Sequence, residues 1–335
     1  MTGMSAIKFT DPTNSAEGTT VDTTSNDTEW YNYEDKKWAN AKTEDGSMWV
    51  WIPRYAYRIH KENGVETQKF DVVFLVGLTD NYYDENGKLQ TAQRQTSEDQ
   101  TIVTNGDTYT VHPAFTNESS INYANGGWDA ELAGIWVAKF EAGYASGNNS
   151  ATVKASSVNY SQDTSYVPAI ETGTIGTTTA RNWLDGEYGT TTTAIKYPTF
   201  QGLTYSMNYI NHNDVYRISK VLTESGNIYG LSSNSTDSHL MKNSEWGAVS
   251  YLSQSKYGLD GTDIVINSVY LNNTTKSVYA VTGCASSTAD ASAVSTTIGA
   301  LNNRTQSSVY VWTQKNGTAA SSTGTIYGIY DMSGG

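Results

Sequence analysis

The sequence predicts an α+β protein in which a strand-rich N-terminal part precedes two helices packed on antiparallel strands. Three observations predict this class. Residues 48–59 and 70–76 are rich in β-branched and aromatic side chains, which favour strands. Residues 244–256 place apolar side chains at helical spacing. Residues 213–226 show the same spacing between a polar start and a glycine stop, which predicts a second helix.

The helix over 244–256 is the best-specified element of the chain. Four apolar side chains form a stripe along it: Trp246, Val249 and Leu252, with Ala248 beside them. We expect this stripe to face a core. The helix over 213–226 should pack near it.

Both ends of the helix over 244–256 carry capping signals. Asn243 or Ser244 can cap its start, and Glu245 lies in the first turn, where the helix dipole favours a carboxylate. Lys256 and Gly258 can end it by supplying a cation and a left-handed stop.

The N-terminal part divides by composition. Residues 10–29 are rich in Thr, Ser, Asn and Asp, so we assign 1–29 to a loop or tether and 30–125 to a β-rich module. The aromatic cluster within 30–38 fits a hairpin that turns at 34–36. We expect it to form a satellite core, with sugar binding as the alternative.

Two positions should determine where the strands of this module bend and pair. Pro53 interrupts the run 48–59, so that run must be an edge or a bend. The pair Asn63-Gly64 predicts a hairpin between this run and the strand that contains 70–76. A further core strand is expected between Glu131 and Glu141, with an acid at each end.

Residues 80–87 contain several acids but lack the alternating oxygen ligands of an EF-hand loop. An Asn86-Gly87 hairpin turn is the favoured interpretation. We therefore expect no cofactor, and structural calcium stays open.

Composition excludes several classes of function. The chain has 335 residues and a formal net charge of −13, which disfavours nucleic acid and anionic membrane surfaces. The single Cys284 excludes an internal disulfide framework. The four histidines are far apart in sequence and form no metal-binding or catalytic motif.

Two segments resemble the formylglycine-generating-enzyme (sulfatase-modifying factor) family, which has a C-type-lectin-like fold. Leu240 followed by Glu245-Trp246 is similar to that family's glutamate-tryptophan helix, and residues 326–335 resemble its terminal element. The resemblance implies a lectin-like domain over 126–335, preceded by the β-rich module. The implied structural residues are Glu141, Leu240, Glu245, Trp246, Tyr327, Gly328, Tyr330, Asp331, Met332 and Gly334. A solvent-exposed Trp246, or a strand at 244–256, would contradict this assignment.

The family's copper-binding cysteine pair has no counterpart here, since Cys284 lies upstream of the terminal element. No catalytic residue is therefore assigned. In the family the terminal element continues into further strands. We therefore expect the domain to be incomplete at Gly335, with Tyr330 and Met332 lacking the neighbours that those strands would supply.

A second resemblance covers nearly the whole chain. Residues 45–57, preceded by 30–33 and 38–41, look like a set of large surface proteins of gut Clostridia, whose members often carry a prepilin-type helix upstream.

The expected function is that of a non-enzymatic ligand-binding or display protein on a bacterial cell surface or pilus, outside the cell. Its expected partners are a host glycan, a surface protein or other pilus subunits. We expect no nucleic acid and no membrane contact by these residues. Two alternatives stay open: a formylglycine-generating-type oxidase that stops before its cysteines, and a phage receptor-binding or tail protein with a lectin-like fold.

Overall fold

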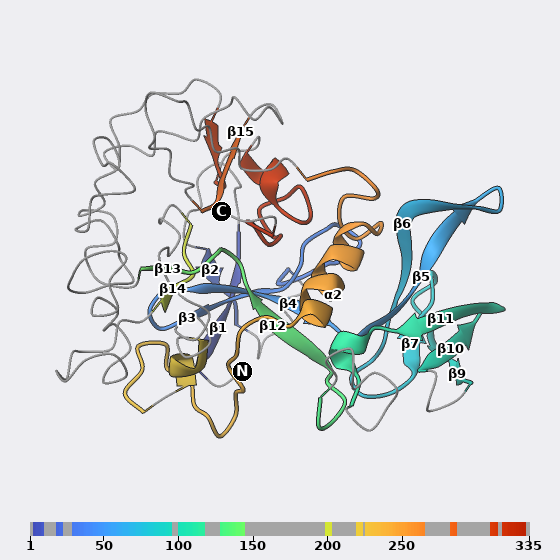
Figure 1. Ribbon diagram of the computed structural model, residues 1–335, viewed down its shortest axis with the longest axis horizontal. Coiled ribbons are helices and arrows are strands. Elements are labelled where there is room, and N and C mark those ends of the chain that lie inside the picture. Colours follow the sequence, from blue (N-terminus) through green and yellow to red (C-terminus); the bar gives the residue numbers. More distant parts are fainter. Residues whose placement is uncertain are drawn as a thin grey trace, which may run out of the picture.

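The chain is sheet-rich, and α2 (Asn243–Ser253) is its longest described helix (Figure 1). The computed structural model describes residues 3–9, 18–22, 29–95, 100–117, 128–144, 198–202, 219–223, 225–264, 282–286, 309–313 and 317–332. Within these ranges the α+β class is confirmed. The described residues contain no helix that is long and apolar enough to span a membrane.

The first sheet has five strands, each antiparallel to its neighbours. Their order is β12 (Gly134–Ala138), β4 (Met48–Pro53), β3 (Asn40–Thr43), β1 (Met4–Lys8) and β2 (Thr19–Thr20). One face is fully covered, because Val50 and Ile52 of β4 are both 0% exposed. The alternation of buried and partly exposed residues along β12 follows from the two-residue period of a strand.

The second sheet also has five strands. Their order is β6 (Val65–Phe74), β5 (Tyr55–Glu62), β11 (Asp107–Val111), β10 (Thr101–Thr104) and β9 (Gln93–Arg94). In Figure 1 it lies to the right of α2, and most of the first sheet lies to the left. Pro53 ends β4 and Tyr55 begins β5, so the expected bend carries the chain from one sheet to the other.

Short elements complete the described chain. The strand pairs are β7 (Asn81–Tyr83) with β8 (Leu89–Thr91), β13 (Gly143–Tyr144) with β14 (Pro198–Thr199), and β15 (Cys284–Ser286) with β16 (Val309–Val311). The 3-10 turns are η1 (Pro113–Phe115), η4 (Val221–Thr223) and η6 (Gly317–Ala320).

The predicted hairpin turns are confirmed. Asn63 and Gly64 have φ values of 52° and 81°, the left-handed pair that a two-residue hairpin needs between β5 and β6. At 84–88 the Asp84 carboxylate accepts the N–H groups of Asn86 and Lys88, at 3.0 and 2.9 Å, and closes the β7–β8 hairpin.

One core joins both sheets to α2. It contains Val50, Ile52, Tyr55, Phe115, Ile135, Ala248, Val249, Leu252 and Ile329. Trp38 also belongs to it and is 0% exposed, so the aromatic cluster at 30–38 contributes to the main core and forms no satellite. A second cluster packs the terminal segment 317–332 on β1, through Ile7, Phe9, Phe140, Trp312, Tyr327 and Tyr330.

The first sheet contains strands from all three expected segments, 1–29, 30–125 and 126–335. β1 lies in the expected tether, because Ala6 and Ile7 are apolar enough to be buried at 2% and 0% exposure. β12 comes from the expected second domain and pairs with β4 of the β-rich module through five residue pairs, from Gly134↔Pro53 to Ala138↔Trp49. The first sheet therefore has strands on both sides of the expected boundary near 125.

The prediction that Trp246 faces the core is wrong. The side chain is 46% exposed, while Ala248, Val249 and Leu252 are buried as expected. The inward helical positions are 245, 248, 249 and 252, so Glu245, at 4% exposure, occupies the core-facing position in the first turn and Trp246 falls on the flank. By the criterion stated above, this counts against the lectin-like assignment.

The ends of α2 also differ from the prediction. Lys242 is the N-cap, and the Glu245 carboxylate accepts its N–H at 2.7 Å. The helix ends at Ser253. Gly258 does not act as a left-handed stop; a Cβ there would lie 2.3 Å from the Ser253 carbonyl oxygen, so close packing requires the glycine.

The expected helix at 213–226 lies partly outside the described residues. Its described part is helical at 219–220 and continues as η4, with Leu222 buried. The Ser219 carbonyl accepts the Ser238 hydroxyl at 2.5 Å, which ties this segment to the chain that leads into α2.

Candidate functional site

Of the terminal residues with a predicted family role, Tyr327 and Tyr330 lie in the second core cluster. Tyr330 is 2% exposed and stacks on Phe140 at 5.2 Å, and Tyr327 donates its hydroxyl to the Phe9 carbonyl at 2.8 Å. Phe140 and Trp312 pack against the Tyr330 ring. The expectation about strands after Gly335 stays a prediction. Gly334 lies outside the described residues.

Gly328 is required by close packing. A Cβ at this position would lie 2.6 Å from Thr323 Oγ1 and 2.8 Å from the Thr323 backbone nitrogen. The glycine therefore lets the terminal segment fold tightly on itself.

Glu141 and Asp331, predicted separately, come together. Asp331 Oδ2 accepts the backbone N–H groups of Glu141 at 3.4 Å and of Gly283 at 3.3 Å. Burial, and then the charge of Glu141, raise the pKa of Asp331 to about 7. The Asp331 backbone adopts a left-handed φ of 60°. The hydrogen bond between them joins the segment that follows β12 to the terminal segment.

Glu245 organises the N-terminal end of α2. Its carboxylate lies 3.1 Å from His239 Nε2, and the His239 ring packs edge-on against Trp128 at 5.0 Å. Lys242 Nζ lies 3.5 Å above the same Trp128 ring. Leu240, predicted as a family landmark, is 48% exposed just before this end of the helix.

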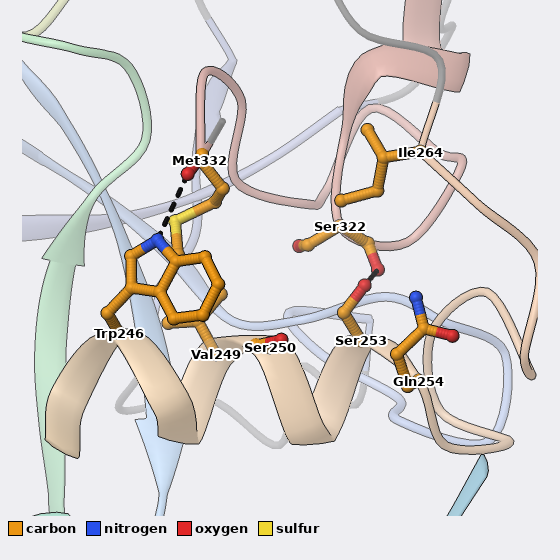
Figure 2. A pocket seen from close by; sticks show the side chains of 8 residues that line it. All are labelled: Trp246, Val249, Ser250, Ser253, Gln254, Ile264, Ser322 and Met332. Carbon is orange, nitrogen blue, oxygen red and sulfur yellow. Dashed lines mark hydrogen bonds between the residues drawn. The ribbon is translucent and has the colours of Figure 1, made fainter. Parts of the chain in front are cut away.

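A groove runs along the flank of α2, between the helix and the terminal segment (Figure 2). Its lining residues are Trp246, Val249, Ser250, Ser253, Gln254, Ile264, Ser322 and Met332. The cavity volume is about 120 Å³. Of the family landmarks, the structure brings only Trp246 and Met332 to this groove.

Two hydrogen bonds hold the walls of the groove together. The Trp246 indole N–H donates to the Met332 carbonyl at 3.0 Å, and the Ser253 hydroxyl donates to the Ser322 carbonyl at 2.8 Å (Figure 2). Both bonds join α2 to the terminal segment. The first bond anchors one edge of the half-exposed indole to the terminal segment.

The chemistry of the groove is neutral. None of the described residues that line it is ionisable; they offer aromatic and aliphatic surface, hydroxyl groups and one amide. The arrangement can bind an uncharged group but supplies no acid or base. Across the described part of the chain, no group of three His, Cys, Asp or Glu side chains is placed to hold a metal ion.

Sequence reasoning missed most of this lining. Ser250 and Ser253 follow Trp246 at spacings of four and seven residues, which marks a polar flank beside the apolar stripe. Ile264 and Ser322 come from separate loops, and no local pattern places them beside a helix.

Comparisons of this chain with family models, curated proteins and solved structures found no match. The family and surface-protein resemblances therefore stay predictions.

Proposed function

We propose that this protein is a non-enzymatic ligand-binding protein displayed on a bacterial cell surface or pilus, and that the groove beside α2 binds a neutral host glycan. One observation carries the proposal: a fixed, half-exposed Trp246 indole forms one wall of a groove whose described lining has no charge. For the finer architecture the observations divide: the contact of the Glu245-Trp246 helix with the terminal segment favours a lectin-like fold, and the exposure of Trp246 counts against it.

The indole suits the apolar face of a sugar ring. An exposed aromatic ring with an anchored polar edge offers a large flat surface at little entropic cost. Ser250 and Gln254 border the same groove and can exchange hydrogen bonds with ring hydroxyls. The groove is small, about 120 Å³, so it would contact one face of a single sugar ring.

Electrostatics favour an uncharged ligand. The chain carries a formal charge of −13, so sialylated or sulfated glycans approach against the net field. A neutral hexose or N-acetylhexosamine meets no such barrier.

A glycan array followed by titration tests this proposal. We expect the full chain to bind arrayed neutral glycans, and Trp246→Ala to weaken that binding by at least about tenfold. Tyr83→Ala is the matched control, because Tyr83 is 63% exposed on the β7–β8 hairpin and does not line the groove. Binding to mucus proteins stripped of glycans, with a silent array, would point to a protein partner and overturn the glycan proposal.

A further inference from the structure

Three side chains form a line along the groove beside α2. Trp246, Ser250 and Gln254 all line the groove, and they follow one another at intervals of four residues. Residues four apart are neighbours on one side of a helix, with about 5–6 Å between their Cβ atoms. Figure 2 shows Trp246 and Met332 at one end of this line and Gln254 and Ile264 at the other.

Most polar atoms of the groove already have partners inside the protein. The Trp246 indole N–H and the Ser253 hydroxyl donate to backbone carbonyls of the terminal segment, and Ser322 Oγ accepts a backbone N–H of that segment at 3.0 Å. Gln254 Nε2 donates to the Thr262 carbonyl at 3.4 Å. This bond assigns the two ends of the amide and leaves its oxygen, Oε1, on the other side.

Two polar groups of the groove stay available to a ligand. None of the described residues forms a hydrogen bond with the Ser250 hydroxyl or with Gln254 Oε1. The hydroxyl can donate a hydrogen bond, and the amide oxygen can accept one. The groove therefore offers a donor and an acceptor about one helical turn apart.

The rest of the lining is apolar. Val249 is fully buried beneath the Trp246 side of the groove, and Met332 and Ile264 add two further apolar side chains. A small apolar group gains free energy when it leaves water for such a surface. The groove therefore combines one donor, one acceptor and an apolar surface.

We propose that this groove selects sugars that carry an acetamido group, such as N-acetylglucosamine and N-acetylgalactosamine, over the matching hexoses. The inference rests on the proposed function and names the class of sugar. The acetamido N–H donates to Gln254 Oε1, the acetamido carbonyl accepts the Ser250 hydroxyl, and the methyl group contacts Val249 and Met332. A trans amide directs its N–H and its C=O in opposite directions, which suits two partners along one line.

A plain hexose matches the groove less well. It has a hydroxyl group where the acetamido sugar has its amide, and it brings no methyl group to the apolar surface. One missing carbon group in an apolar pocket changes selectivity by about tenfold or more. We therefore expect a preference of at least that size.

Matched pairs of methyl glycosides test this preference: N-acetylglucosamine against glucose, and N-acetylgalactosamine against galactose. Titrations of the full chain, followed by ligand-observed NMR, should give dissociation constants that are lower by about tenfold or more for the acetamido sugar of each pair. Saturation transferred from the protein to the bound sugar should be largest at the acetyl methyl protons.

Variants assign the preference to the two polar groups. Ser250→Ala and Gln254→Met should each reduce the ratio of the two dissociation constants, mainly by weakening the binding of the acetamido sugar. Ser233→Ala is the matched control and should keep the ratio, because Ser233 is exposed and does not line the groove. Circular dichroism should show that all three variants keep the fold.

The outcomes separate this inference from the proposed function. Equal affinity for hexoses and acetamido sugars would leave the proposed function standing and overturn the preference. A preference that is unchanged in both Ser250→Ala and Gln254→Met would also overturn it. Failure of every neutral glycan to bind would overturn the proposed function, and this inference with it.

Discussion

Arg54 and Lys139 are both fully buried basic residues, but their surroundings differ. Arg54, at the bend between the sheets, lies 3.0 Å from Glu131 and 3.8 Å from Asp80, and Arg94 binds Asp80 as well. Among the described residues, the oxygens that contact Lys139 Nζ are all neutral. At Arg54 opposite charges hold the two sheets in place, whereas at Lys139 an amine without a described ion pair holds the segment that builds the groove.

Two partly buried acids, Asp80 at the bend and Asp331 in the terminal segment, show a related contrast. Hydrogen bonding to Arg94 lowers the pKa of Asp80 below its ordinary value. Burial raises the pKa of Asp331 to about 7. Carboxylates at the bend are compensated by arginines, and the carboxyl group at the terminal segment is not.

The largest expected effect is the loss of Arg54. Arg54→Met leaves Glu131 partly buried without its 3.0 Å partner and removes the hydrogen bond to the Thr79 carbonyl. Breaking a buried ion pair by removing one partner costs about 3–5 kcal/mol. Urea unfolding should show a loss of that size.

Arg58→Met is the control for this comparison. Arg58 pairs with Asp71 at 2.8 Å, but its side chain is 35% exposed. We expect a loss of less than about 1 kcal/mol. Equal losses for the two variants would show that the burial of Arg54 does not increase the cost of removing its ion pair.

The second prediction concerns pH. The raised pKa of Asp331 means that the folded chain holds this proton more tightly than the unfolded chain, whose pKa is 3.8. The stabilisation is therefore fully present below a pH of 3.8 and is lost as the pH rises through about 7. Asp80 acts in the opposite sense, since its stabilisation is present above 3.8 and is lost as the pH falls through its lowered pKa.

Asp331→Asn isolates this effect, because asparagine tolerates the left-handed φ of 60° at this position. Between acid and mildly alkaline pH, the wild type should lose on the order of 2–4 kcal/mol of unfolding free energy relative to the variant. Unfolding curves over this range measure the difference. Parallel pH profiles would mean that Asp331 titrates normally.

The third prediction tests the packing beside Lys139. Gly328→Ala places a Cβ 2.6 Å from Thr323 Oγ1 and shifts the carbonyl that contacts the Lys139 amine. Overpacking of this kind costs about 1–3 kcal/mol. Gly247→Ala in α2 is the control; its Cβ would meet nothing closer than 3.6 Å, so it should stabilise the protein by about 0.5–1 kcal/mol. Thermal unfolding of both variants distinguishes a specific clash from a general intolerance of alanine.

Sequence patterns predicted the local elements well. Turn residues such as Asn63-Gly64 and Asn86-Gly87 act through their own backbone and neighbours, so their hairpins follow from a few residues. The apolar stripe of α2 likewise placed Val249 and Leu252 in the core.

The remaining features depend on contacts distant in sequence. Tryptophan is typical of a protein core, yet Trp246 is exposed. The helix starts at Asn243, and its first turn directs Glu245 toward the core instead. In the sequence, Lys139 looks like an ordinary exposed lysine at the end of a strand. Its burial could not be predicted, because the carbonyls and rings around it come from segments up to 189 residues away. The groove needs Ser322 and Met332 to fold back onto α2, which no local pattern indicates.

The most direct test of the proposed function is a calorimetric titration of the full chain with the best neutral glycan found on the array. The account predicts saturable one-site binding by the wild type and by Tyr83→Ala. Binding should be weaker by at least about tenfold in Trp246→Ala, since loss of an anchoring aromatic side chain costs about 2 kcal/mol or more. Circular dichroism should show that the variants keep the fold. Equal affinity of Trp246→Ala and the wild type would contradict the claim that this groove is the binding site.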